Sequence, residues 1–343
     1  MKSCADNLII YEVGTGASLC IHNKIGVRDP IQFMSGTKSL AALAVGFLYD
    51  EGNIDLDAPI METGASAVTL RQVMNHTSGI SAEWDSGRKH DKAPDVYKYV
   101  LGLPRDHAPG EHYEYNNNAV ELCGMRVQQI TGISLGAYLR EKLAPIGVQI
   151  ADWSGDAVGH DYTSWGTVLR ADDLMRIGKM LAGDTAFLAE CGLIAPLISR
   201  KYLDMMVREQ LLVWRDDVDT SAGLSTPFYM DGYLGQLLYV GKQIIIRQQR
   251  WRKNIDIERI KREVDELIIA ASPSHDGGNA SSSKDASSSK DSMSGAVVIM
   301  LGLLLYVFAC LMEDAAKGVV DACTAVCGWF RDMCSEDASP LKN

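Results

Sequence analysis

The alternation of apolar and polar positions predicts strands at both ends of a globular region. Near the start, NLIIYEVG and SLCIHNK flank the turn-forming residues TGA, which is typical of a β-hairpin. Towards residue 250, LLYVGKQIIIRQ predicts two more strands around a Gly-Lys turn. Between these strands, from about 69 to 183, apolar positions recur mostly at helical spacing, as in NAVELCGMRVQQITG and RADDLMRIGKMLAG. After the last strand, NIDIERIKREVDELIIAA predicts a helix that closes the globular region. This order predicts one antiparallel sheet built from both chain ends and flanked by helices, in an α+β fold arranged as a layered α/β sandwich.

The composition changes abruptly after Ala271. Residues 272–293 contain ASSSKD twice in tandem and are too poor in apolar residues to fold, so we expect a flexible tether. Ser294–Met312 carries no charge, and its length as a helix is about 30 Å, the thickness of a bilayer core, which predicts a transmembrane helix. Residues 313–343 predict a short amphipathic tail with cysteines at the membrane surface. The expected order is a domain over 1–271, with its helical region at about 53–205, then tether, span and tail.

Charge and cysteine usage narrow the possible partners. The formal net charge of −11 argues against a nucleic-acid partner, and RQQRWRK is expected to be a solvated surface, with a phosphate or headgroup contact as the alternative. The eight cysteines lack a disulfide framework and a C-x-x-C pair, and His76, His107, His112 and His160 are not at metal-ligand spacing, so no metal is expected. The N-terminus has no apolar stretch of signal-peptide length, which favours tail-anchored insertion with the globular domain in the cytosol. Basic residues on both sides of the span leave its orientation undecided.

A Ser-x-x-Lys pair opens the stretch QFMSGTKSLAALAVGFLYDEG. The pattern occurs five times in the chain, but only Ser35 begins an apolar helix, and Lys38 shares its helical face. Leu40–Leu48 is apolar on almost every side, so the helix is expected in the core, where desolvation would lower the pKa of Lys38. A neutral amine could then take the serine proton, and the Ser35 N–H could hold an oxyanion. The alternative is that Ser35 or Gly36 only caps the helix while Lys38 reaches solvent.

Two later segments carry groups that suit acyl transfer. HYEYNNNAVELCG places Tyr115 and Asn117 before an amphipathic helix. A tyrosine near an ammonium ion has a lowered pKa and can act as acid or base, and an asparagine amide can bind a carbonyl or the lysine. In DGYLGQLLYV, Gly235 lets a substrate approach the strand edge, and the N–H of Gln236 could be a second oxyanion donor. The alternatives are a packed loop tyrosine with Asn117 as a helix cap, and a hairpin turn that requires glycine.

Together these segments resemble the serine β-lactamase and penicillin-binding protein superfamily, in particular its class C-like esterases and the 6-aminohexanoate-dimer-hydrolase-like branch. The resemblance covers roughly residues 6–271 and includes TLRQVMNHTSGI, ITGISLGAYLREKLAPIGV and SWGTVLRADDLMRIGKML. It implies a site between the sheet and an all-helical region. It also implies that Ser35 forms an acyl-enzyme, that Lys38 and Tyr115 share the proton transfers, and that Asn117 orients lysine or substrate. The N–H groups of Ser35 and Gln236 would hold the oxyanion, water would release the acyl group, and no cofactor would be needed.

The third motif departs from the family pattern of Lys or His, a small residue and Gly. Tyr233-Leu234-Gly235 takes its place, so β-lactam or peptidoglycan substrates, whose carboxylate the cation would bind, are not expected. The Gly235-Gln236 pair instead resembles the amide hydrolases and esterases. The family's helix before the first strand is missing, and the stretch from Asp184 to Tyr229 is shortened. The leading hypothesis is a membrane-tethered serine hydrolase acting on a small ester or amide. The alternatives are a catalytically impaired scaffold or binding module at a membrane, and a receptor or adhesion protein.

Overall fold

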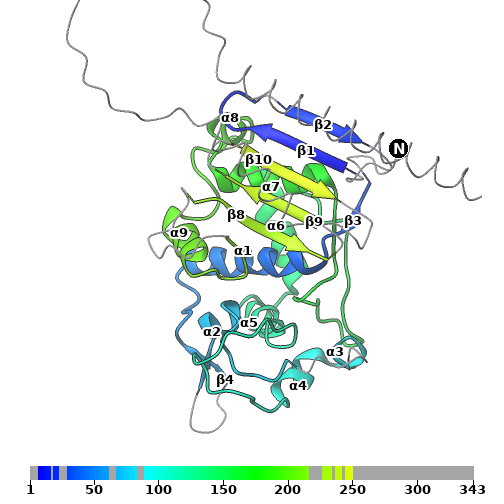
Figure 1. Cartoon of the computed structure of the whole chain (residues 1–343), viewed down its shortest axis with the longest axis vertical. Coiled ribbons are helices and arrows are strands. Elements are labelled where there is room, and N and C mark those ends of the chain that lie inside the picture. The colour runs from blue at the N-terminus through cyan, green and yellow to red at the C-terminus, as the bar shows by residue number, and fades with distance from the viewer. Residues whose placement is uncertain are drawn as a thin grey trace, which may run out of the picture. The chain divides into compact units, whose positions relative to one another are not determined.

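The structure is a computed structural model that describes residues 7–16, 18–22, 29–61, 67–82, 89–215, 226–233, 236–241 and 244–249. Its main sheet is antiparallel, with strands in the order β2 (Ser18–His22), β1 (Asn7–Glu12), β10 (Ile244–Gln249), β9 (Gln236–Val240) and β8 (Phe228–Gly232) (Figure 1). Strands β1 and β10 pair along their whole length, with Asn7 opposite Gln249 and Glu12 opposite Ile244. The predicted sheet from both chain ends and the two predicted hairpins, β1–β2 and β9–β10, are therefore confirmed.

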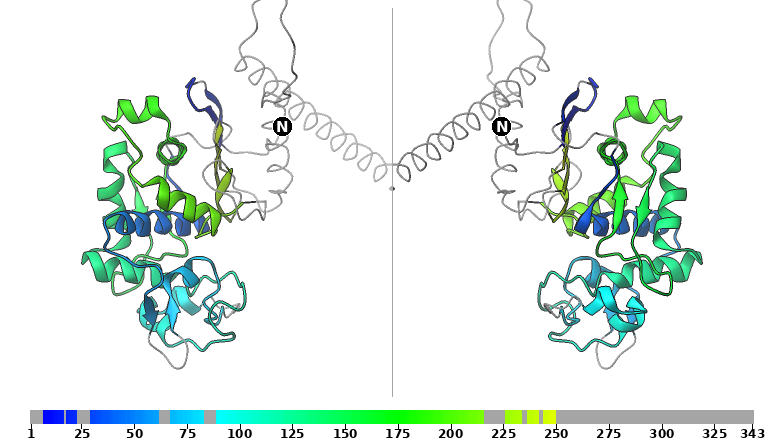
Figure 2. Two further views of the ribbon diagram at one scale, coloured as in Figure 1. Left: turned by 90° about the vertical axis from the view of Figure 1, so that its left-hand side faces the viewer. Right: turned by 90° about the vertical axis from the view of Figure 1, so that its right-hand side faces the viewer.

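Helix α7 (Ala171–Ala182) packs on β9 and β10 at close range. Gly178 makes this approach possible, because a Cβ at that position would lie 2.7 Å from Ile245 Cγ2 and 3.2 Å from Leu238 Cδ1. Two short helices follow along the chain, α8 (Thr185–Glu190) and α9 (Arg200–Arg208). Figure 2 shows the sheet edge-on, with helices on one of its faces.

Helix α1 (Thr37–Asp50) is the buried centre of the described domain. Its residues from Thr37 to Leu48 are all buried, which confirms the core helix predicted from its apolar run. It packs against α5 (Glu121–Thr131), α6 (Leu135–Leu143) and α9. The Tyr202 ring fills the space left by Gly46, and its hydroxyl donates to the Ala42 carbonyl at 2.7 Å. Each buried leucine of such a helix stabilises the fold by about 1.5–3 kcal/mol, so α1 is a rigid support for the residues at its N-terminal end.

A second region lies on the other side of α1 from the sheet (Figure 1). It contains α2 (Leu70–Met74), α3 (Lys89–Lys92), α4 (Val96–Leu101) and α5. The stretch 53–205 was expected to be helical, but the structure adds short strands to it. Strand β4 (Pro59–Met61) pairs with β5 (Val68–Thr69). Strand β6 (Asp152–Trp153) pairs with β7 (Thr167–Leu169), and β3 (Ile31–Gln32), which comes before this stretch, pairs with the other edge of β7. The 3₁₀ turn η2 (Ala144–Ile146) lies between α6 and β6. Such two- and three-residue strands are too short to leave an alternating pattern in a sequence.

Several expectations fall on other parts of the chain. The helix over 254–271, the tether 272–293, the span 294–312 and the tail 313–343 lie outside the described residues. Within the described ranges, no helix combines the length and the apolar character that crossing a membrane requires.

Candidate active site

Ser35 lies in the 3₁₀ turn η1 (Met34–Gly36), between β3 and the start of α1. Met34 has a φ of +52°, a left-handed conformation that is costly for a residue with a Cβ. The turn is tight because Gly36 lies on the buried Phe33 ring, where a Cβ would come within 2.5 Å of the ring carbons. The strained residue immediately before Ser35 therefore presents this half-buried serine at the N-terminal end of a rigid helix.

Lys38 is fully buried, and its amine lies beside Ser35. The Nζ atom donates to Ser35 Oγ at 3.1 Å and to the Ser164 carbonyl oxygen at 2.6 Å. Desolvation lowers the pKa of Lys38 from 10.5 to about 7, and the carboxylates of Glu121 and Asp231 oppose that shift. The predicted lowering is confirmed, and the alternative in which Lys38 reaches solvent is wrong.

Tyr115 completes a cluster of three polar side chains. It shares a side-chain hydrogen bond with Ser35, and Lys38 Nζ lies 5.0 Å from the centre of its ring. Burial raises the pKa of Tyr115 to about 12, the carboxylate of Asp231 adds to that, and the bond to Ser35 opposes it. The expectation of a lowered tyrosine pKa is therefore wrong, because removal of the phenol from water outweighs any benefit of the nearby amine. Tyr115 is a neutral phenol at neutral pH.

The loop that carries Tyr115 is held by two buried asparagines. Asn116 Nδ2 donates to the Ile80 carbonyl at 2.6 Å, and its Oδ1 accepts from the Ala119 N–H at 2.8 Å. Asn118 Nδ2 donates to the backbone carbonyls that follow Ile80, at 3.2 and 3.1 Å. Asn117, between them, is only half-buried, and α5 begins after Val120, so Asn117 does not cap that helix. Asn116 and Asn118 thus hold this loop in the conformation in which Tyr115 is hydrogen-bonded to Ser35.

His76, which the sequence analysis considered only as a metal ligand, supports the same loop. Its φ is +60°, its Nδ1 accepts from the Asn116 N–H at 3.2 Å, and its ring centre lies 4.8 Å from that of Tyr115. Burial, followed by the charge of Lys38, lowers the pKa of His76 to about 3. The imidazole is therefore neutral at neutral pH and acts as a hydrogen-bond acceptor at Nδ1.

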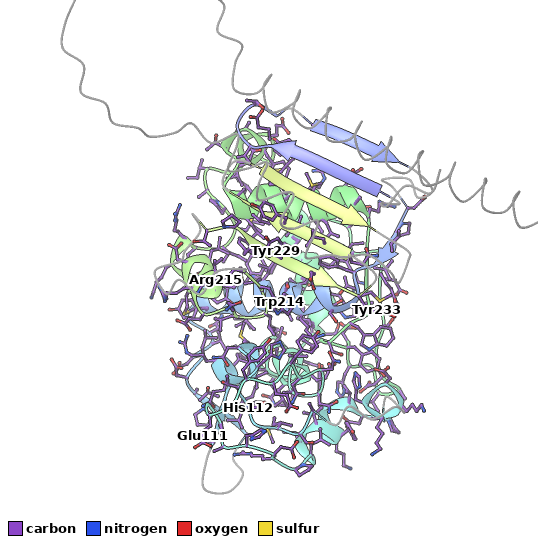
Figure 3. All side chains as sticks on the ribbon, in the orientation of Figure 1. Glu111, His112, Trp214, Arg215, Tyr229 and Tyr233 are labelled. Carbon is purple, nitrogen blue, oxygen red and sulfur yellow. The ribbon has the colours of Figure 1, made fainter. Side chains whose placement is uncertain are left out.

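The third predicted segment reaches the same corner from the sheet. Strand β8 ends at Gly232, which packs on η1, and Gln236 opens β9 directly opposite Gly232. Gln236 is buried, whereas Tyr233 is 58% exposed at the end of β8 (Figure 3). Gly235 lies outside the described residues. The structure therefore brings the backbone around Ser35 and the start of β9 to one corner, as the sequence predicted.

Trp214 is a neighbour of the site that sequence reasoning missed. It exchanges two backbone hydrogen bonds with Tyr229 of β8, of 3.0 and 2.7 Å, so it lies beside that strand (Figure 3). Its ring centre is 6.4 Å from that of Tyr115. Nothing in the sequence around Trp214 marks it, because its partner strand is formed by residues further along the chain.

Comparison with known proteins fits this arrangement of residues. A family model described as Beta-lactamase matches residues 23–243, which is more than half of the chain. The chain belongs to the beta-lactamase family. Sequence similarity extends to protein Flp of Staphylococcus aureus (strain MW2), 27% identical over 32% of this chain and 25% of Flp. It also extends to the 6-aminohexanoate-dimer hydrolase of Paenarthrobacter ureafaciens, 28% identical over 52% of each chain.

A solved structure shows the same fold. A Bacillus anthracis protein provisionally assigned as a 6-aminohexanoate-dimer hydrolase has a TM-score of 0.61 and 16% identity, covering 78% of each chain. The α+β fold of the beta-lactamase family is thereby established for this domain. Along the curated relatives it matches, the chain spans about a quarter of Flp and about half of the hydrolase.

Elsewhere in this beta-lactamase-family domain, Asp95, Asp156 and His160 have ligand atoms within 4.8 Å of one another and could hold a metal by distance alone. Their atoms already have other partners. Asp156 accepts from the backbone N–H groups of Val96, Val158 and His160 at 2.8–3.1 Å, and Asp95 caps α4. His160 Nδ1 lies 2.9 Å from Asp156 Oδ2. These contacts give the cluster a role in joining the loop after β6 to the start of α4.

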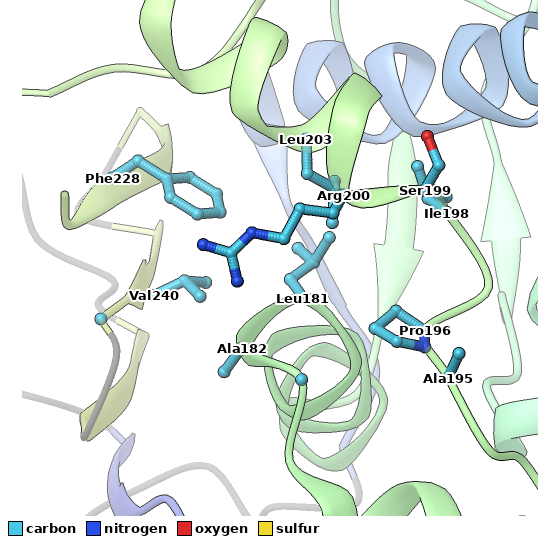
Figure 4. A pocket seen from close by; sticks show the side chains of 12 residues that line it. Leu181, Ala182, Ala195, Pro196, Ile198, Ser199, Arg200, Leu203, Phe228 and Val240 are labelled. Carbon is cyan, nitrogen blue, oxygen red and sulfur yellow. The ribbon is translucent and has the colours of Figure 1, made fainter. Parts of the chain in front are cut away.

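A cavity of about 500 Å³ lies between α7, α9 and the ends of β8 and β9 (Figure 4). Its walls are mainly apolar, including Leu181, Leu203, Phe228 and Val240, and the Arg200 side chain extends across it. None of the Ser35, Lys38 and Tyr115 side chains lines it. The cavity and the polar cluster are therefore different places.

Proposed function

We propose that this member of the beta-lactamase family is a serine hydrolase that forms an acyl-enzyme on Ser35 with a small ester or amide. The observation that carries the proposal is the buried Lys38 amine, 3.1 Å from Ser35 Oγ and with a pKa of about 7. At neutral pH a substantial fraction of that amine is unprotonated, and only an unprotonated amine can accept a proton. A nucleophile paired with such a base is the minimum machinery for acyl transfer.

In the acylation step, Ser35 Oγ forms a bond to the substrate carbonyl carbon as its proton passes to Lys38 Nζ. The negative charge that develops on the carbonyl oxygen would be held by the N–H groups of Ser35 and Gln236, whose segments meet at this corner. Tyr115, a neutral phenol, donates a proton to the leaving oxygen or nitrogen and recovers one from the Lys38 ammonium. Water then attacks the ester on Ser35, with Lys38 taking its proton, and the acid product leaves.

Two features bear on the substrate, the first on recognition of a carboxylate and the second on the bond that is cut. The exposed Tyr233 stands where the family commonly has a cation, so a negatively charged group has no partner at that position. The name of the relative from Paenarthrobacter ureafaciens, a 6-aminohexanoate-dimer hydrolase, points to an amide bond as a substrate for this fold. In this proposal the side-chain amide of Asn117, two residues after Tyr115, donates to a carbonyl oxygen of the substrate, and Gly235 has no side chain that would obstruct the substrate.

We further propose that the hydrolase domain is tethered to a membrane through Ser294–Met312, with the domain in the cytosol. The uncharged stretch of bilayer length and the Ser-rich segment before it support this proposal. Protease treatment of sealed vesicles tests it, because a domain enclosed in the lumen would be protected whereas a cytosolic one would be digested.

The test of catalysis is labelling of the full chain by a fluorophosphonate probe, with mass spectrometry to locate the adduct. Wild type should be labelled at Ser35, and Ser35→Ala should lose both labelling and nitrophenyl butyrate hydrolysis. Ser39→Ala is the matched control, since Ser39 is a buried serine on the same helix that donates to the Leu212 carbonyl instead. Folded wild type that is neither labelled nor active would favour the catalytically impaired scaffold.

A further inference from the structure

Glu121, the first residue of α5, is a fully buried carboxylate whose charge acts on Lys38. Its Oε2 accepts from the Thr163 N–H at 2.6 Å, and its Oε1 accepts from the Ser164 N–H at 3.0 Å. The Ser164 hydroxyl also bonds to it. The carboxylate therefore fixes the segment that enters β7 at two successive peptide groups.

Ser164 connects this carboxylate to the candidate base. Its N–H faces Glu121, while its carbonyl oxygen accepts the 2.6 Å hydrogen bond from Lys38 Nζ. That carbonyl and Ser35 Oγ are the two oxygens that the structure gives the amine as hydrogen-bond partners. A displacement of Ser164 would therefore change where the amine lies relative to the serine hydroxyl.

The charge of Glu121 requires an explanation beyond holding two N–H groups. Burying a carboxylate costs several kcal/mol unless hydrogen bonds and an opposite charge compensate, and a glutamine of nearly the same shape would offer an acceptor at lower cost. Burial raises the pKa of the Glu121 carboxyl, and its hydrogen bonds to Ser164 and Thr163 oppose this. What a carboxylate adds is a negative charge that acts on Lys38 in the direction that raises the pKa of the amine.

We propose that Glu121 is a positioning residue for Lys38, holding the Ser164 carbonyl against the amine and supplying the negative charge that keeps the amine a usable base. The inference rests on the proposed acyl transfer at Ser35. Helix α5 and the loop before it would then serve the site in two ways, since the loop carries Tyr115 and the helix begins with Glu121, which positions Lys38.

Geometry excludes a separate Ser-His-Asp catalytic site formed by Ser164, His90 and Asp91. His90 Nε2 lies 3.3 Å from Ser164 Oγ and 2.8 Å from Asp91 Oδ1, so both contacts fall on one ring nitrogen. A catalytic histidine needs its carboxylate partner on the other nitrogen. Ser164 is also buried, with 1% of its surface exposed. His90 therefore belongs to the support of Ser164 and not to a separate nucleophile.

The charged and titratable groups around the pair come from several elements. Lys38 is faced by Glu121 from α5, by Asp231 from β8, by Tyr115 from the loop before α5 and by His76 from the loop after α2. Glu121 is faced in addition by His90 from α3, Tyr97 from α4, Cys123 from its own helix and Tyr162 from the loop before β7. A variant at position 121 must therefore be compared with wild type over a full range of pH.

The experiment measures the rate of Ser35 acylation by the fluorophosphonate probe from pH 5 to 10 in the full chain. For Glu121→Gln we expect the plateau rate to fall about 10- to 100-fold and the midpoint of the acid limb to move down by about one pH unit, because the amine loses the stronger of the two negative charges that act on it. Glu121→Asp keeps the charge but shortens the reach, so its plateau should fall while its midpoint stays near that of wild type. Glu111→Gln, an exposed glutamate at the far end of the helical region (Figure 3), is the matched control and should behave as wild type.

The outcomes separate this inference from the function on which it rests. Absence of labelling in folded wild type overturns the acyl transfer itself. Labelled wild type with an unchanged plateau and midpoint in folded Glu121→Gln overturns the role of Glu121. A lower plateau with an unmoved midpoint in that variant also overturns it, because a purely structural residue would act in that way. If Glu121→Gln does not fold, Glu121→Asp tests the positioning of the amine alone, and a wild-type plateau in that variant contradicts the proposal.

Discussion

Gly232 of β8 lies so close to Phe33 that a Cβ at position 232 would be 2.3 Å from the Phe33 carbonyl oxygen and 3.1 Å from the Gly36 nitrogen. The sheet and the turn η1 therefore meet at very short range, through two backbone atoms of the turn and the Cβ of Met34, which would lie 3.0 Å from the added carbon. Because Gln236 is the pairing partner of Gly232, this contact also fixes the start of β9 relative to Ser35. A single glycine thus sets the spacing between the two proposed oxyanion donors.

Replacing that glycine should disturb the site more than the fold. In Gly232→Ala the added methyl must push η1 away from β8, and a displacement of about 1 Å in a catalytic group can cost 10²-fold in rate. We expect the probe labelling rate of Ser35 to fall by about that factor, while circular dichroism remains that of a folded protein. Gly102→Ala is the control, since the nearest atom to a Cβ there would be the Tyr99 carbonyl oxygen, at 3.5 Å. Equal labelling rates for both variants would contradict a fixed spacing at Gly232.

Removing the buried amine should stabilise the protein while abolishing its activity. The pKa of Lys38 is about 7 in the folded chain and 10.5 when solvated, so between those values the unfolded chain binds more protons and stability rises with pH. Lys38→Met should therefore increase the free energy of unfolding by about 3–5 kcal/mol at pH 7 and below, with the gain shrinking towards pH 10. Urea unfolding at pH 7 and 9.5 measures this, with the exposed Lys98→Met as control. A gain that does not depend on pH would show that Lys38 is not deprotonated by folding.

Loss of the Tyr115 hydroxyl should affect substrates according to their leaving groups. A nitrophenolate leaves without a proton, whereas an amine or alkoxide needs one from an acid. We expect Tyr115→Phe to lower kcat/KM for an anilide or alkyl ester about 10²- to 10³-fold and for a nitrophenyl ester much less. Tyr113→Phe, at an exposed tyrosine two residues earlier, should leave both substrates unaffected. If the two substrate classes lose rate equally in Tyr115→Phe, the phenol is not the acid.

A cation in place of Tyr233 should restore recognition of a carboxylate. A hydrogen bond to a charged group contributes about 1.5–3 kcal/mol, which corresponds to about 10- to 100-fold in binding. We expect Tyr233→Lys to increase labelling by a fluorescent penicillin, which carries a carboxylate, by about 10-fold without changing hydrolysis of a neutral ester. Val158→Lys places the same charge at a residue of matching exposure, 59% against 58%, and should have no effect. An unchanged penicillin rate in Tyr233→Lys would show that position 233 does not face the substrate.

The sequence predicted the parts of this domain whose signals are local. The two hairpins follow from alternating strands around turn residues, and the burial of Lys38 follows from the apolar run that begins next to it. The meeting of Ser35, Tyr115 and Gln236 required the family resemblance, because no local pattern says which loops share a corner.

Contacts between distant residues escaped prediction for a physical reason. An acidic residue at the start of a helix, such as Glu121, is ordinarily favoured there by the helix dipole and exposed to water. Its partners Thr163 and Ser164 come more than 40 residues later, so the sequence around it gives no sign of burial. The raised pKa of Tyr115 escapes prediction for a related reason, since the loss of water around its ring depends on neighbours such as Trp214 that belong to other segments.

The pairing of β1 with β10 also bears on the order in which the protein is made. Ser35 and its helix leave the ribosome early, but the strand that joins β1 to the rest of the sheet is the last described element to be synthesised. Closing the chain between such distant partners is slow, because the entropy of the long loop is lost before the contacts form. During synthesis β1 and β2 remain without their neighbour, and the corner around Ser35 lacks its wall of β8 and β9. Ser35 can therefore gain its surroundings only when translation of the domain is nearly complete.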